Sequence, residues 1–116
     1  MIIQKDKTYK EIIEQITVDG LDTIIAENSY TIIDVRNSKG IETQGSIPGA
    51  INIPFDSIDK SIEEDNDIFN CDGPFLFCCT GGVMSYMAAI KAQEKGVKNV
   101  CNLEGGHSAW MKLQMT

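Results

Sequence analysis

Metal-ligating and basic residues are scarce in this sequence. Its single histidine is His107, and its four cysteines form no Cys-x-x-Cys pair. Structural zinc sites are built mostly from such pairs together with histidine, so we expect no metal centre and no cofactor. The formal net charge is −7, which argues against nucleic acid or an anionic membrane as a partner, because both require a basic surface.

Arginine and long apolar runs are scarce as well. Arg36 is the only arginine, beside nine lysines, so no other side chain can bind an oxyanion through the planar guanidinium fork. The apolar runs are far shorter than the roughly 20 residues of a membrane-spanning helix. The N-terminal stretch MIIQKDKTYKEIIEQ lacks the apolar segment and cleavage site of a signal peptide. We therefore expect a cytoplasmic protein whose cysteines stay reduced.

What the chain does contain is an alternation of short apolar stretches with stretches of helical period. We predict strands at TIIDV (31–35), GAINI (49–53), PFLFC (74–78) and KNVCNL (98–103), with ITV (16–18) as a candidate first strand. We predict helices at 18–28 and 85–96, weaker ones at 55–63 and 106–113, and an extra helix within 1–14. This alternation predicts a single α/β domain over residues 1–116, with a parallel sheet that binds ligands at the carboxyl ends of its strands.

The stretch CCTGGVMS (78–85) lies between a predicted strand and a predicted helix. Gly81 and Gly82 allow a sharp turn and leave main-chain N–H groups uncovered. Together with the positive end of the helix, these groups can bind an anion such as a thiolate or persulfide. A helix end contributes up to ~2 kcal/mol to such binding, so a loop without charged residues can still activate a cysteine in part.

The choice between the two cysteines depends on where the strand ends. If Cys78 closes the strand, its side chain points into a covering layer, and Cys79 faces the loop. This favours Cys79 as the nucleophile and leaves Cys78 as the alternative. The same stretch also fits a non-catalytic interpretation, in which a glycine-rich turn connects the strand to the helix and both cysteines are core residues.

Three separated stretches follow the order of motifs in one known family. DVRNSKGIETQGSIPGAINIP (34–54) is similar to a DVR motif followed by GHIPGAxNIP. Residues 79–85 with Ala88 and Ala89 are similar to CxxGxRS followed by AA, and GVKNVCNLEGGHSAW (96–110) is similar to GVxNVxxLxGGxxAW. On these motifs the chain resembles the rhodanese family over about residues 16–113, which leaves 1–15 as an N-terminal extension.

The resemblance implies a doubly wound, three-layer α/β fold around a central, mostly parallel five-stranded sheet. It also implies a sulfurtransferase: Cys79 takes sulfane sulfur from thiosulfate or a persulfide donor, holds it as a persulfide, and passes it to a thiol or cyanide. The persulfide would be held by main-chain groups of the active-site loop, which comprises Thr80, Gly81, Gly82, Val83, Met84 and Ser85. Ser85 would add a hydroxyl donor or cap the helix. Asp34 and Arg36 would support the sheet as an ion pair, and we expect a monomer or weak dimer.

One departure from the family pattern bears on activity, because Met84 stands where the family often has arginine. We therefore expect poor turnover of thiosulfate and a protein persulfide as an alternative donor. We expect no phosphatase activity, since rhodanese-like phosphatases need that arginine and a loop longer by one residue. A catalytically weak or inactive binding or regulatory module is the alternative function, and a redox sensor that pairs Cys78 with Cys79 is a third.

We expect the remaining notable side chains to have structural and not catalytic roles. We expect Trp110 and Cys101 in the core, Cys71 in a loop, and His107 at the surface or at a helix start.

Overall fold

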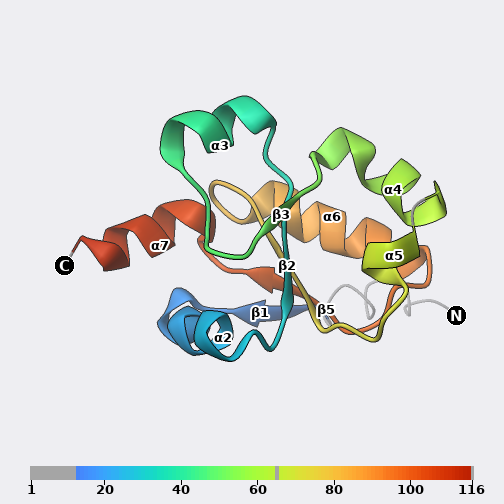
Figure 1. Cartoon of the computed structure of the whole chain (residues 1–116), viewed down its shortest axis with the longest axis horizontal. Coiled ribbons are helices and arrows are strands. Elements are labelled where there is room, and N and C mark those ends of the chain that lie inside the picture. Colours follow the sequence, from blue (N-terminus) through green and yellow to red (C-terminus); the bar gives the residue numbers. More distant parts are fainter. Residues whose placement is uncertain (1–12, 65, 116) are drawn as a thin grey trace, which may run out of the picture.

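The computed structural model describes residues 13–64 and 66–115, and it contains a five-stranded parallel sheet (Figure 1). The strands are β1 (Glu14–Ile16), β2 (Thr31–Asp34), β3 (Ile51–Asn52), β4 (Phe75–Cys78) and β5 (Val100–Leu103). Their order across the sheet is β1-β5-β4-β2-β3, and every pair of neighbours runs parallel. The predicted parallel sheet is confirmed.

Helices cover both faces of this sheet, which gives the three-layer arrangement (Figure 1). They are η2 (Val18–Gly20), α2 (Leu21–Glu27), α3 (Ser38–Gln44), η3 (Phe55–Ser57), α4 (Ile58–Glu64), α5 (Asn66–Phe69), α6 (Val83–Glu94) and α7 (Gly106–Gln114). Residues of α4 and α6 join one apolar layer, and residues of α2 and α7 join the other. The predicted α/β fold class is thus confirmed.

Strand β4 shows why the apolar run PFLFC predicts a central strand. All four of its residues are buried. Phe75 and Phe77 lie in the layer with α6, whereas Leu76 and Cys78 lie in the layer with α2. Successive side chains of a strand point to opposite faces, so a strand covered on both faces needs apolar residues throughout.

Several boundaries differ from the sequence-based expectation. Strand β1 lies at 14–16 and not at 16–18, because its pairing with β5 joins Gln15 to Asn102. Residues 18–28 form a short 3-10 turn and then α2. The extra helix expected within 1–14 falls on residues that the structure does not describe, except for Ile13 and Glu14, of which Glu14 already belongs to β1.

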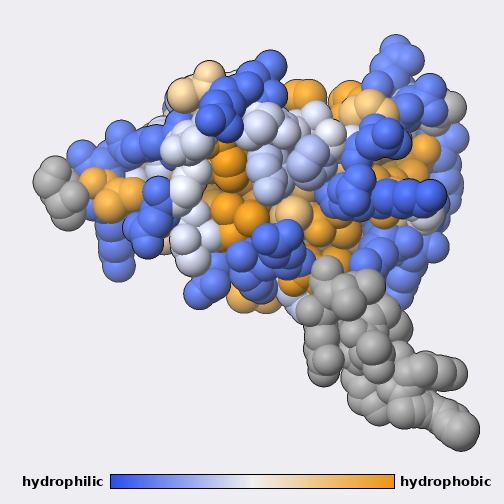
Figure 2. Space-filling view, turned by 90° about the horizontal axis from the view of Figure 1, so that it is seen from below, coloured by the Kyte–Doolittle hydropathy of each residue, from blue (hydrophilic) through white to orange (hydrophobic). Residues whose placement is uncertain are grey.

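The surface is mixed in character. Figure 2 views the molecule from the side on which α2 and β1 lie, and it shows hydrophilic residues around most of the outline with apolar groups between them. Within residues 13–64 and 66–115, no helix combines the length and the apolar character needed to cross a bilayer.

Candidate active site

The chain turns sharply between β4 and α6, at the carboxyl edge of the sheet. The loop comprises residues 79–82 only, because α6 begins at Val83, two residues earlier than expected. Gly82 precedes the helix with φ 100° and ψ −5°, and a Cβ atom there would lie 3.1 Å from the nitrogen of Gly105 and 3.2 Å from the carbonyl oxygen of Leu103. The turn therefore requires glycine at 82, while Gly81 keeps an ordinary φ.

This turn directs main-chain N–H groups at the sulfur of Cys79. Cys79 Sγ accepts hydrogen bonds from the nitrogen of Gly82 at 3.1 Å and from the nitrogen of Ser85 at 3.3 Å. We call these donors, with the first turn of α6, the nest. The Cys79 side chain is only 3% exposed. A nest of this kind favours a negative charge on the sulfur.

The environment of Cys79 makes its thiol more acidic than usual. Burial acts to raise the pKa of Cys79, but hydrogen bonds from Ser85, Gly82 and Gly81 act in the opposite direction and prevail, so the pKa lies below its ordinary value. A larger fraction of Cys79 is consequently thiolate at neutral pH, which is the nucleophilic form.

The other buried cysteines lie in the opposite environment. Cys78 is fully buried in the layer with α2, and burial followed by the charge of Asp34 raises its pKa. Cys101 also lies in that layer, and burial together with Glu14 raises its pKa to about 11. Both thiols therefore stay protonated at neutral pH.

The first turn of α7 packs against the loop and donates hydrogen bonds to it. The sequence analysis did not predict this contact. The nitrogens of His107 and Ser108 donate to the carbonyl oxygens of Cys79 at 2.8 Å and Thr80 at 3.0 Å. A Cβ atom on Gly106 would lie 2.5 Å from the carbonyl oxygen of Cys79. Two adjacent glycines before a helix were the available signal for such a close approach.

His107 corrects one expectation. It lies at a helix start as expected, but it is 3% exposed and not at the surface, because the turn that contains it packs against the loop. Burial and the charge of Arg36 lower the pKa of His107, so its ring is neutral at pH 7 and adds no charge near the nest.

Asp34 and Arg36 form the expected ion pair. Arg36 Nη2 lies 2.6 Å from Asp34 Oδ2 and also donates to the carbonyl oxygen of Gly45 at 2.8 Å, and both charged side chains are buried. The guanidinium group is thus engaged by the protein itself. Arg36 does not line the small cavity beside the loop described below.

Ser85 is not the N-cap of α6, since Gly82 takes that position. The Ser85 side chain is buried and its Oγ donates to Oδ1 of Asn102 at 2.6 Å. Val83 and Met84 fill the first helical turn, with Val83 73% exposed and Met84 half-buried against the layer under α6. The expected loop residues therefore divide between a short loop and the helix start.

A cavity of about 140 Å³, which we call the cavity beside the loop, has Met84 in its wall, from the helical turn that follows the loop. Its lining comprises Val35, Asn37, Pro54, Phe55, Asp56 and Met84. These residues follow β2 and β3 or belong to the first turn of α6, so the cavity lies at the carboxyl edge of the sheet. Of the described residues in this lining, Asp56 alone is ionisable. The described lining therefore combines apolar and polar groups, with the carboxylate of Asp56 at its exposed rim.

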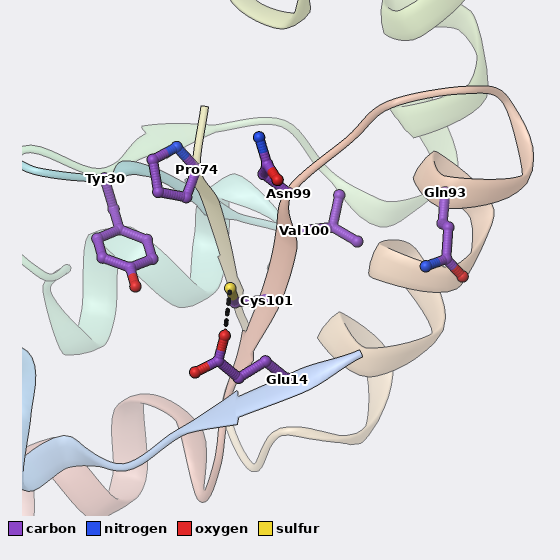
Figure 3. Close-up of a pocket in the computed structure, with 7 residues that line it drawn as sticks. All are labelled: Glu14, Tyr30, Pro74, Gln93, Asn99, Val100 and Cys101. Carbon is purple, nitrogen blue, oxygen red and sulfur yellow. Dashed lines mark hydrogen bonds between the residues drawn. The ribbon is translucent and has the colours of Figure 1, made fainter. Parts of the chain in front are cut away.

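A larger cavity of about 440 Å³ lies at the opposite, amino edge of the sheet (Figure 3). Glu14, Tyr30, Pro74, Gln93, Asn99, Val100 and Cys101 line it, and Cys101 Sγ lies 3.9 Å from Glu14 Oε1. Its only cysteine has a raised pKa. We therefore place the candidate active site at Cys79 and the smaller cavity, whose lining residues Val35, Phe55 and Met84 belong to the same apolar layer as Cys79.

Comparison with known proteins identifies the family and supports the fold. The sequence profile of the rhodanese-like domain matches residues 17–113. The thiosulfate sulfurtransferase GlpE of Shewanella oneidensis is 29% identical over 97 residues, which cover 84% of this chain and 91% of the relative.

Two solved structures share the fold. A Staphylococcus aureus rhodanese-like domain protein is 32% identical with a TM-score of 0.72, over 84% of this chain and 90% of the other. A Rhodopseudomonas palustris protein of unknown function, named as a possible tyrosine phosphatase, is 28% identical with a TM-score of 0.84, over 98% and 95%.

Proposed function

Because this chain belongs to the rhodanese family, we propose that it is a sulfurtransferase that holds sulfane sulfur on Cys79 as a persulfide. The observation that best supports this function is the pair of N–H groups, from Gly82 and Ser85, that donate to Cys79 Sγ. Sulfurtransferase relatives at about this level of identity, such as GlpE of Shewanella oneidensis, point to the same class of reaction.

In the first step the Cys79 thiolate attacks the outer sulfur of the donor. With thiosulfate, a Cys79–S bond forms, the bond between the two donor sulfurs breaks, and its electron pair leaves with sulfite. With a persulfide donor, the pair leaves with the donor thiolate. The product in both cases is the anion Cys79–S–S⁻, and the main-chain donors of the nest stabilise its charge.

In the second step an acceptor takes the outer sulfur. A thiolate or cyanide attacks the terminal sulfur, a new sulfur–sulfur or sulfur–carbon bond forms, and the electron pair of the Cys79 persulfide bond returns to Cys79. The acceptor leaves as a persulfide or thiocyanate, and the enzyme thiolate is regenerated. No redox partner is required, since both steps are displacements at sulfur.

The donor that suits this site best is a persulfide and not thiosulfate. Among the residues that the structure describes, the lining of the cavity beside the loop has no lysine or arginine, and its one ionisable residue, Asp56, repels dianionic thiosulfate more strongly than a singly charged persulfide. Met84 supplies an apolar wall where the family often has arginine. Cys79 is 3% exposed, which favours a narrow terminal sulfur over a tetrahedral oxyanion.

A protein persulfide fits these conditions. Val83 and Met87 expose apolar side chains next to the loop, 73% and 47% exposed, and together with Gln15, Gly82 and Tyr86 they line a hollow of about 250 Å³. A partner that docks there would bring an extended persulfide-bearing segment to Cys79. We also propose a cytoplasmic location, because the Cys79 thiol must stay reduced. A monomeric or weakly dimeric state is part of the same proposal.

The geometry favours neither the alternative of a binding or regulatory module nor phosphoryl transfer. A binding or regulatory module has no use for a thiol whose pKa is lowered by directed donors. Phosphoryl transfer needs a cation at the loop, and Arg36, the only arginine, is buried against Asp34. The phosphatase suggestion in the name of the Rhodopseudomonas palustris protein therefore does not transfer to this chain.

Intact-protein mass spectrometry tests the proposal. Reduced protein is incubated with thiosulfate or with a small-molecule persulfide, and Cys79→Ser and Cys78→Ser serve as paired variants. We expect the mass of one sulfur atom to be gained with the persulfide, removed by cyanide, and absent only in Cys79→Ser. No gain from either donor would contradict the sulfurtransferase function, and loss of the gain in Cys78→Ser alone would move the nucleophile to Cys78.

A further inference from the structure

Asn102 is one of the few buried polar side chains among the described residues. It lies in β5, is 1% exposed, and alternation along the strand puts it on the same face as Val100, which belongs to the layer under α6. A buried amide costs free energy unless its donors and acceptor find partners. Its presence in β5 is therefore explained by what it binds.

The amide of Asn102 links three elements through three hydrogen bonds. Nδ2 donates to the carbonyl oxygen of Gly82 at 3.0 Å and to Gln15 Oε1 at 3.0 Å, and Oδ1 accepts from Ser85 Oγ at 2.6 Å. A main-chain carbonyl can only accept, so the amide nitrogen must face Gly82. This orientation leaves the amide oxygen to the hydroxyl of Ser85.

Gly82 and Ser85 are also the residues whose N–H groups donate to Cys79 Sγ, at 3.1 and 3.3 Å. We propose that Asn102 is a positioning residue of the nest: it holds Gly82 by its carbonyl and Ser85 by its hydroxyl, and so keeps both N–H groups directed at Cys79 Sγ. Asn102 acts through these two residues and not on the sulfur itself.

Gly82 is the residue that most needs such a restraint. Its φ of 100° is accessible because it lacks a side chain, and for the same reason glycine has more alternative conformations than any other residue. The direction of its N–H group depends on which conformation is selected. A hydrogen bond from the rigid strand β5 to its carbonyl oxygen selects one conformation and thereby sets the donor geometry at Cys79.

The chemical consequence is stabilisation of the anionic forms of Cys79. Well-directed N–H donors lower the free energy of a thiolate or persulfide relative to the neutral thiol. The part of this inference that concerns sulfur transfer rests on the proposed function. The effect on the Cys79 thiolate needs no sulfur donor, however, so it can be tested even if the proposed reaction fails.

The test measures the rate of alkylation of Cys79 by iodoacetamide as a function of pH, in a Cys71→Ser background that removes the exposed thiol. Asn102→Leu replaces the amide by an apolar group of similar volume, and Asn102→Ala is a second uncharged variant in case Leu misfolds. Asn52→Leu is the matched control, because Asn52 also donates its Nδ2 to two carbonyl oxygens, those of Asp34 and Arg36, and neither Asp34 nor Arg36 supplies the N–H groups that donate to Cys79 Sγ. Thermal unfolding verifies that each variant is folded.

We expect the pKa of Cys79 to rise by about one unit in the Asn102 variants, with alkylation at pH 7 slowed roughly 3- to 10-fold. The control should keep the pKa of the parent protein. Asn102 would be a purely structural residue if its folded variants changed the pKa no more than Asn52→Leu does, and that result would overturn the proposal. Loading of sulfur onto Cys79, measured separately by mass, reports on the proposed function alone.

Discussion

Cys78 and Cys79 are adjacent in the chain but lie in different apolar layers, on opposite faces of the sheet. Cys78 closes β4 and is fully buried, whereas Cys79 opens the loop and accepts two main-chain hydrogen bonds. Their pKa values are consequently shifted in opposite directions, upward for Cys78 and downward for Cys79. The Cys78 thiol therefore stays protonated at neutral pH, whereas the Cys79 thiol loses its proton more readily than an ordinary cysteine.

This difference predicts how stability changes at alkaline pH. The pKa of Cys78 is raised in the folded state, chiefly by burial, so above the ordinary thiol pKa of about 8.5 the unfolded chain loses this proton while the folded chain keeps it. The free energy of unfolding should fall by about 1.4 kcal/mol per pH unit in that range because of Cys78. Cys101 and Tyr30, whose pKa values are also raised, add to the fall.

Cys78→Ala checks this prediction in denaturant titrations between pH 7 and about pH 10.5. We expect the variant to lose less stability over this range than the parent protein does. Cys79→Ala is the matched control: the pKa of Cys79 is lowered in the folded state, so its contribution to stability is already present above the ordinary pKa and does not decline there. Equally steep losses in the parent and in Cys78→Ala would show that Cys78 ionises in the folded protein.

Met84→Arg should raise thiosulfate turnover. Met84 lines the cavity beside the loop, where Asp56 is the only ionisable residue within the part of the chain that the structure describes. A guanidinium group at this position would attract the dianionic donor and favour the thiolate, and a charge-assisted hydrogen bond of roughly 1.5–3 kcal/mol corresponds to an increase of about 10-fold or more in kcat/KM. The measurement is sulfite or thiocyanate release at fixed cyanide.

Met84→Gln is the control for this change, since it adds a long polar side chain without charge. We expect little gain from it with thiosulfate. Turnover of a singly charged persulfide donor should change less in Met84→Arg than turnover of dianionic thiosulfate does. Equal gains with both donors would mean that the cation acts on the thiol and not on donor charge.

The sequence predicts the sheet well because its strands are covered on both faces. Burial of β4 on two sides requires a continuous apolar run, and such a run is visible without any structure. Cys79 likewise follows from alternation at the end of this strand, and its role as the nucleophile remains a prediction. Local signals therefore locate the elements and the candidate thiol.

The parts that the sequence analysis missed depend on contacts between distant segments. Asn102 lies 20 residues from Gly82 in the chain, and only the packing of β5 beside the loop reveals their hydrogen bond. The sequence places the start of α6 too late because Ser85 resembles an N-cap, whereas a left-handed glycine takes that position. The burial of His107 likewise follows from the docking of α7 against the loop.

Arg36→Met should destabilise the protein without changing the chemistry of Cys79. Arg36 and Asp34 form a buried ion pair at 2.6 Å, and removal of the cation leaves a carboxylate buried without its partner. Loss of one partner of a buried pair costs about 3–5 kcal/mol. Denaturant unfolding measures the loss, and the sulfur loaded per folded molecule should stay close to that of the parent protein.

Lys95→Met is the matched control for a surface pair. Lys95 contacts Glu63 at 2.6 Å, the same distance, but both side chains are partly exposed. We expect almost no change in unfolding, because water solvates the charge that remains. Comparable losses in both variants would indicate that burial does not determine the strength of the Arg36 pair.

Gly106→Ala should disturb the loop through its main chain. A Cβ atom at 106 would lie 2.5 Å from the carbonyl oxygen of Cys79 and 2.6 Å from that of Thr80, and the φ of 62° is unfavourable for alanine. Either α7 moves away or the loop shifts, and both weaken the hydrogen bonds from His107 and Ser108. We expect a loss of about 1–3 kcal/mol in unfolding free energy and slower alkylation of Cys79 at pH 7. Gly20→Ala is the control, because a Cβ atom at 20 would meet no described residue within 4 Å beyond its chain neighbours, and the φ there is −95°. If Gly20→Ala slowed alkylation as much as Gly106→Ala does, the reactivity of Cys79 would not depend on the contact with α7.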